Sequence, residues 1–183
     1  QPSAWSVAHY VELHGEIDAP LLARAIVAGM NDADTLKLRI EEQDGEAYQW
    51  VDESLILTAP VIHDLRAQAD PEAAAHAVMQ ADLSQDLRLE SGQPLYHHAL
   101  LLLGDARWFW YQRYHHVAVD GFSFPDITRR IAAIYTAWRH EQTPEPSPFT
   151  PFSEVVEEYQ RYQHSDTFTR DAAFWREQLT QLP

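Results

Sequence analysis

Two adjacent histidines stand just before an Asp-Gly pair in the segment 111–124, YQRYHHVAVDGFSF. A histidine held in one tautomer can accept a proton at neutral pH, because its ordinary pKa is about 6.5. His115 and His116 are therefore candidates for a general base or for positioning an incoming nucleophile. The sequence has no cysteine and no serine in a Gly-x-Ser-x-Gly elbow. These absences favour direct chemistry without a covalent enzyme intermediate.

Alternation along a strand separates the two histidines. The aromatic stretch 107–116 is typical of a β-strand, on which neighbouring side chains point to opposite faces. His116 then shares a face with Tyr114, whereas His115 lies on the other face. We expect one ring to face a cleft while the other packs or hydrogen-bonds behind it. The same geometry disfavours a metal site, because metal ligands must converge on one point.

The Asp-Gly pair is placed to turn the chain between this strand and a helix. Asp120 could orient a histidine or bind an arginine, and Gly121 allows a positive φ or close approach of a substrate to the backbone. The segment 123–126 has the spacing of a capping box, with Asp in place of Glu. Apolar residues then recur at helical spacing from Ile127 to Trp138, which predicts one long helix.

The rest of the chain predicts an α+β fold, a mixed or mostly antiparallel sheet with helices packed on it. Alternation predicts strands at 6–14, 35–41, 48–51 and 96–103, and one or two short strands in 55–65. Asp44-Gly45 is a hairpin turn signal, and the tight turn at Gly104-Asp105 predicts a hairpin between the strand 96–103 and the aromatic strand. Helical spacing predicts helices at 18–30, 70–81, 152–159 and 166–179, the first with Asp18 as its N-cap and Pro20 in its first turn. Lys37 and Arg39 would share one strand face. His97 and His98 repeat the histidine pair without an Asp-Gly, and we interpret them as ordinary strand residues.

Composition limits the class of protein. The chain has 183 residues, of which 45% are hydrophobic, enough for one domain with a real core. Its formal net charge of −15 and lack of any Lys/Arg-rich run argue against nucleic acid or an anionic membrane as partner. The absence of cysteine fits a reducing compartment, and we expect a cytoplasmic protein. Because the sequence begins with Gln1, we interpret it as a piece of something longer.

The run His115 to Gly121 resembles the HHxxxDG signature of condensation domains of nonribosomal peptide synthetases. Chloramphenicol-acetyltransferase-like acyltransferases share that signature more widely. The segment 34–40 resembles the family's RHExLRTxF motif, and 149–152 resembles the segment before the crossover between its two lobes. The proline-rich connection 143–151 and two further helices follow the motif. The whole chain 1–183 therefore resembles the N-terminal lobe, most closely that of serine-activating synthetases in enterobactin-type siderophore assembly.

This resemblance implies a reaction and its partners. Two lobes would form a V, with an acyl group passing from a donor aryl or peptidyl carrier protein to the amine of an acceptor aminoacyl thioester. In the enterobactin-type case the donor would be 2,3-dihydroxybenzoyl and the acceptor would be seryl. No cofactor would bind directly, because phosphopantetheine arms of the carrier proteins present both substrates. The C-terminal lobe and an adenylation domain would belong to the same protein, and the fragment alone would be inactive.

The resemblance also assigns roles to the motif. His116 would be catalytic, as a base or as the group that orients the amine, with His115 supporting it. Asp120 would hold the loop through a salt bridge to an arginine. In this sequence Lys37 stands where the family motif has that arginine, and Arg39 follows two residues later, so both are candidates for the partner. Arg39 is favoured because a planar guanidinium suits a buried carboxylate.

Two other functions are compatible with the sequence. One is a stand-alone CoA-dependent acyltransferase of the same superfamily. The other is a non-catalytic lobe that only docks carrier proteins, for which we expect a buried His116 with no cleft beside it.

Overall fold

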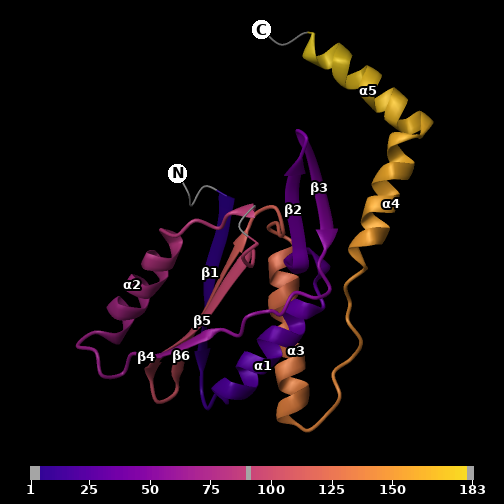
Figure 1. Cartoon of the computed structure of the whole chain (residues 1–183). Helices are drawn as coiled ribbons and strands as arrows, with labels where there is room; N and C mark the ends of the chain where they lie inside the picture. The colour runs from indigo at the N-terminus through magenta and orange to yellow at the C-terminus, as the bar shows by residue number, and fades with distance from the viewer. Residues whose placement is uncertain (1–4, 90–91, 181–183) are drawn as a thin grey trace. The chain divides into compact units, whose positions relative to one another are not determined.

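The computed structural model describes residues 5–89 and 92–180 and divides the chain into two compact units, Gln1–Pro148 and Phe149–Pro183 (Figure 1). The strands are β1 (Ser6–His14), β2 (Leu38–Gln43), β3 (Glu46–Val51), β4 (Val61–Asp64), β5 (Tyr96–Gly104) and β6 (Arg107–His115). The helices are α1 (Ala19–Asn31), α2 (Pro71–Leu83), α3 (Ser123–Arg139), α4 (Phe152–Gln163) and α5 (Asp166–Leu179).

A four-stranded mixed sheet organises the first unit, in the order β1-β6-β5-β4. Strand β6 is antiparallel to both of its neighbours, and β4 joins the edge of β5 in the parallel direction. The aromatic strand that carries the histidine motif is thus central, paired on both sides. The predicted hairpin between β5 and β6 is confirmed, and every residue from Trp108 to His115 is buried.

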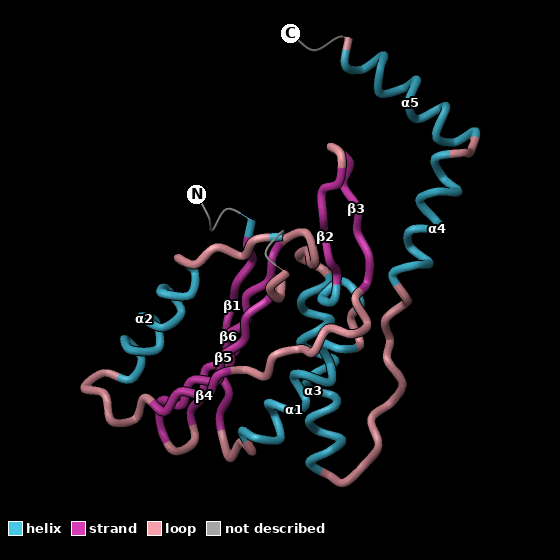
Figure 2. Tube along the Cα trace, viewed as in Figure 1, coloured by secondary structure: helices cyan, strands magenta, loops and turns pink. Residues whose placement is uncertain are grey.

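Helices cover both faces of this sheet, with α2 on one side and α1 and α3 on the other (Figure 2). Hydrogen bonds across the layers show which side chains face which helix. Tyr111 donates to Asp82 of α2 over 2.8 Å, whereas Gln112 accepts from Thr128 of α3 over 3.0 Å. Alternation along β6 is therefore confirmed, because these two neighbours point to opposite helical layers.

Helix α1 begins as the sequence predicts. The side chain of Asp18 accepts a hydrogen bond from the Leu21 N–H over 2.9 Å, and a proline occupies the first turn. Near its other end, α1 packs closely on α3 at Gly29. A Cβ added there would lie 2.5 Å from Cγ1 of Ile131, so glycine is what allows the two helices to approach.

The predicted strand 35–41 is wrong in its first half. Residues Asp34–Lys37 form a 3₁₀ turn, closed by a hydrogen bond from the Leu36 N–H to the Ala33 carbonyl, and β2 starts at Leu38. Leu36 and Lys37 are both buried. A half-buried strand cannot bury two consecutive side chains on one face, so the prediction of one strand face for Lys37 and Arg39 also fails.

The turn between β2 and β3 has the predicted Asp-Gly chemistry. Asp44 and Gly45 have φ values of 55° and 83°, as a two-residue hairpin turn requires. In 55–65 a single strand forms, β4, and it starts directly after Pro60.

The second unit consists of α4 and α5. Ser165 caps α5 by accepting a hydrogen bond from the Phe168 N–H over 3.1 Å. The Phe168 ring meets Tyr162 edge-on, 5.6 Å between centroids, and Tyr162 donates to Asp171 over 2.7 Å. No helix in the described part of the chain is long and apolar enough to cross a membrane.

Candidate active site

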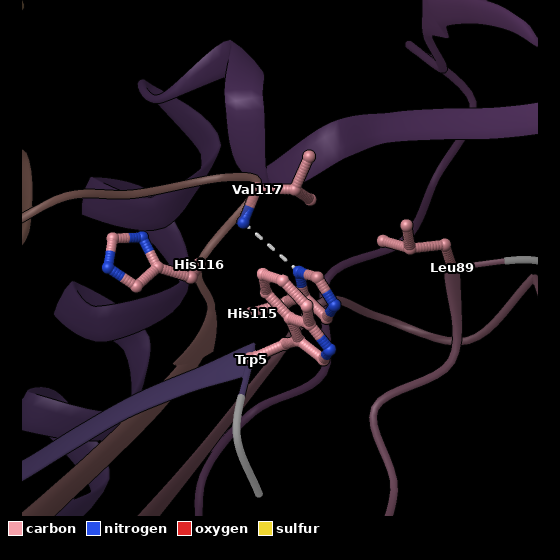
Figure 3. Close-up of a pocket in the computed structure, with 5 residues that line it drawn as sticks. All are labelled: Trp5, Leu89, His115, His116 and Val117. Carbon is pink, nitrogen blue, oxygen red and sulfur yellow. Dashed lines mark hydrogen bonds between the residues drawn. The ribbon is translucent and has the colours of Figure 1, made fainter. Parts of the chain in front are cut away.

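The two histidines stand where β6 ends. The strand stops at His115, one residue before the predicted end. His116 is still hydrogen-bonded to the segment that leads into β1. Its N–H donates to the Trp5 carbonyl over 2.7 Å, and the His115 N–H donates to the Leu95 carbonyl over 2.8 Å. The rings point away from each other, as alternation predicts (Figure 3).

His115 is the buried member of the pair, 8% exposed. Its Nδ1 accepts a hydrogen bond from the Val117 N–H over 3.0 Å, so the ring proton of the neutral imidazole must sit on Nε2. Burial lowers the pKa of His115, and the charge of a protonated His116 would lower it further. His115 is thereby held neutral and in one orientation.

His116 is exposed, and no group among the described residues hydrogen-bonds its ring. A cavity of about 590 Å³ lies beside the pair, lined by Trp5, Leu89, His115, His116 and Val117 (Figure 3). Three of these five residues are apolar, so the cavity offers a mostly non-polar wall next to an accessible imidazole. The buried His116 without a cleft that we expected of a non-catalytic lobe is not what the structure shows.

Asp120 organises the start of α3. Its Oδ1 accepts hydrogen bonds from the Phe122 N–H (3.0 Å), the Ser123 N–H (2.8 Å) and the Ser123 hydroxyl (2.9 Å). These bonds, the one from the Ser123 backbone foremost, lower the pKa of Asp120, because they favour the carboxylate. The predicted capping box at 123–126 is wrong, because Ser123 is already helical and Asp120 satisfies its N–H instead.

The predicted salt bridge from Asp120 to Lys37 or Arg39 is not formed among the described residues. Arg39 Nε lies 3.1 Å from the Asp52 carboxylate, and its Nη1 donates to the Gly92 carbonyl. Lys37 pairs with Glu53 at 2.9 Å and with Asp34 at 3.4 Å. Each cation therefore has a nearer carboxylate.

The buried position of Lys37 is offset by those pairs. Desolvation acts to lower the pKa of Lys37, but the hydrogen bond and charge of Glu53, with the charge of Asp34, raise it above its ordinary value. Lys37 thus stays charged and occupied at the base of the β2–β3 hairpin.

Gly121 does not use the positive φ that its residue type allows, since the glycines with positive φ are Gly15, Gly45 and Gly92. A Cβ at Gly121 would meet nothing within 4 Å. The positive φ is therefore not the reason for a glycine here, and close approach of a substrate to the backbone stays a prediction.

Sequence reasoning missed three residues that line the cavity, Trp5, Leu89 and Val117. The register offered a signal for one of them. Ser6 pairs with His115, so the residue before Ser6 must lie opposite His116. Leu89 reaches the cavity from the connection between α2 and β5, and no local pattern marks it.

A sequence model for the condensation domain matches residues 1–183. The chain belongs to the condensation-domain family. Over its full length this condensation-domain chain is 64% identical to enterobactin synthase component F of Escherichia coli O157:H7, and it spans 14% of that protein's length. The recognition made from the HHxxxDG motif and its flanking segments is confirmed.

Solved condensation domains have the same fold. The starter condensation domain of rhizomide synthetase RzmA superposes with a TM-score of 0.90 at 33% identity, covering 97% of this chain and 43% of that one. A variant of that domain in complex with C8-CoA superposes with a TM-score of 0.91 at 32% identity, covering 100% and 41%. The predicted α+β fold of the chloramphenicol-acetyltransferase type is confirmed, with this chain as one lobe.

Proposed function

We propose that this chain is the N-terminal lobe of a condensation domain that joins a carrier-bound acyl group to a carrier-bound amine. The observation that carries the proposal is the accessible His116 beside the 590 Å³ cavity, in a chain that the condensation-domain family matches over its full length. By likeness to enterobactin synthase component F, we propose 2,3-dihydroxybenzoyl as donor and seryl as acceptor.

His116 would act on the acceptor amine. The amine nitrogen attacks the thioester carbonyl, the C–N bond forms and the C–S bond breaks. The nitrogen gives up one proton, which the imidazole accepts, and the departing thiolate is protonated to a thiol. An imidazole without a hydrogen-bond partner among the described residues is available for this transfer or for orienting the amine. His115, fixed through Val117, would hold the backbone from which His116 projects.

The substrates would arrive on phosphopantetheine arms of two partners, an aryl or peptidyl carrier protein as donor and a peptidyl carrier protein as acceptor. The solved domain that this chain matches is more than twice as long, which supports a second lobe that completes the site. An adenylation domain in the same protein would supply the acceptor. Asp120 and Gly121 would shape the loop at which the arms approach.

The test is His116→Ala in the intact synthetase. We expect amide formation to be lost while adenylation and carrier loading continue at the normal rate. His14→Ala is a matched control, because His14 is an exposed histidine at the far end of β1 from the site. Normal product formation by His116→Ala would refute the proposal.

A CoA-dependent acyltransferase remains the second candidate, favoured by the solved neighbour in complex with C8-CoA. The intact protein should be incubated with octanoyl-CoA and an amine acceptor, with no donor carrier protein present. Amide formation that depends on His116 would support a CoA donor, whereas dependence on the loaded carrier protein supports the first proposal.

A further inference from the structure

A chain of buried side-chain hydrogen bonds runs beneath the histidine motif, and its direction is fixed by one residue. The Trp110 indole N–H can only donate, and it donates to His98 Nδ1 over 3.3 Å. The His98 proton must then sit on Nε2, which donates to the Tyr114 hydroxyl over 2.9 Å. Tyr114 in turn donates to Gln112 Oε1 over 2.9 Å.

The series of hydrogen bonds ends on helix α3. Gln112 Oε1 accepts a second hydrogen bond, from the Thr128 hydroxyl of α3 over 3.0 Å. Thr128 also lies 3.2 Å from the Phe124 carbonyl in the first turn of that helix. Gln112 therefore links strand β6 to α3 through a side-chain hydrogen bond.

The four hydrogen-bonded side chains of β5 and β6 are buried and uncharged. Trp110, His98, Tyr114 and Gln112 are each at most 2% exposed. Burial lowers the pKa of His98 to about 3, so the ring stays neutral and its Nδ1 stays an acceptor at ordinary pH. In such surroundings a hydrogen bond is stronger than in water, and losing one partner is costly.

The hydrogen-bonded residues lie on both sides of the histidine motif in the sequence. Tyr114 lies near the end of β6, two residues before His116, and Thr128 lies in the second turn of the helix that follows the Asp-Gly loop. We propose that the Gln112–Thr128 contact clamps the two ends of the loop 116–122 together, making both residues positioning residues for His116. This inference rests on the proposed function.

The fold does not depend on this contact alone. Ile127, Ile131 and Ile134 of α3 are buried, and α3 packs along α1. Losing the Thr128 hydroxyl should therefore leave α3 in place but free to shift slightly at its first turns. A displacement of about 1 Å at a catalytic group can slow a reaction by about 100-fold.

The experiment compares Thr128→Val with Thr128→Ser in the intact synthetase. Single-turnover amide formation is followed with the donor carrier protein loaded with 2,3-dihydroxybenzoate and the acceptor carrier loaded with serine. We expect Thr128→Val to slow amide formation by about 10- to 100-fold, with an unchanged donor concentration for half-maximal rate. Thr128→Ser should restore the rate, because it restores the hydroxyl. Thr136→Val, an exposed threonine of the same helix, is the matched control and should change nothing.

Several outcomes would overturn the inference: a normal rate in Thr128→Val, no recovery in Thr128→Ser, or equal losses in adenylation and loading. If Thr128→Val fails to fold, Thr128→Ala removes the same hydroxyl from the Gln112–Thr128 contact with a smaller side chain, and it must slow amide formation in the same way. A normal rate there overturns the clamp. Activity of His116→Ala would instead refute the proposed function, so the two failures are distinguishable.

Discussion

Replacing Gly29 by alanine tests how closely α1 and α3 must approach to hold the motif. Alanine favours a helix over glycine by about 1 kcal/mol, so an unhindered site would gain stability. Here the new Cβ would lie 2.5 Å from Cγ1 of Ile131 and 3.2 Å from its Cα. Ile131 is fully buried and cannot swing away.

Overpacking a well-filled core costs about 1–3 kcal/mol, and contact with the Ile131 backbone places this site toward the upper end. After the helix-propensity gain, we expect Gly29→Ala to lower the free energy of unfolding by about 1–2 kcal/mol. For a chain of this size, that corresponds to a melting temperature about 2–8 °C lower. Urea unfolding and thermal denaturation of the purified chain measure both quantities.

Two comparisons decide whether the clash is the cause. Gly104→Ala is a matched control, because its Cβ would meet only Arg107 Cβ at 3.8 Å, an ordinary contact. In an Ile131→Ala background, Gly29→Ala should lose most of its cost, since Cγ1 is gone. The reasoning is refuted if Gly29→Ala stabilises the chain, or if it costs the same with and without Ile131.

Three further changes test other parts of the first unit. The pKa of His98 is about 3 in the folded chain, against 6.5 ordinarily. Between these two pH values the unfolded chain binds a proton at His98 and the folded chain does not. Stability is therefore complete above pH 6.5 and should fall by about 2 kcal/mol between pH 7 and 5, and His98→Gln should flatten that decline in urea titrations at each pH. Arg113, 1% exposed, pairs with Asp82 at 3.1 Å and donates to the carbonyls of Asp82 and of Gln85, just beyond the end of α2. Arg113→Met should therefore cost about 3–5 kcal/mol in the same assay. Asp120→Ala should slow single-turnover amide formation more than Asp120→Asn, because asparagine keeps an acceptor for the Phe122 and Ser123 N–H groups.

Each of these has a result that contradicts it. If the free energy of unfolding of His98→Gln falls between pH 7 and 5 as much as that of the unchanged protein, then other groups cause the pH dependence. A cost for Arg113→Met that is unchanged by adding Asp82→Asn would show that the ion pair contributes little. Equal rates for the two Asp120 variants would remove the hydrogen-bond explanation for that carboxylate.

Predictions from local pattern succeeded where residues close together in the chain decide the structure. The hairpin β5–β6, the Asp18 cap and the Asp44-Gly45 turn follow from periodicity and turn chemistry, which neighbouring residues decide among themselves. The same reasoning failed at 35–41. There the apolar alternation is real, but burial of consecutive residues in the core overrides it.

Some features of the site were also predictable from neighbouring residues, and others were not. The opposite directions of His115 and His116 follow from alternation on β6, and the family followed from the spacing of seven residues with their flanking segments. The hydrogen-bond partners of Asp120 did not follow from the sequence. A carboxylate takes the donors that the fold brings nearest, and here those are the N–H groups of the next turn.

The sequence by itself determined the catalytic candidate, the family and the order of elements, because each depends on residues close together in the chain. The tertiary structure alone decided what surrounds His116. The cavity wall from Trp5 and Leu89 joins segments far apart in the chain, and so does the hydrogen-bonded path from Trp110 through His98 to Thr128. No local pattern records such contacts, since they arise only when the sheet and its helices are packed together.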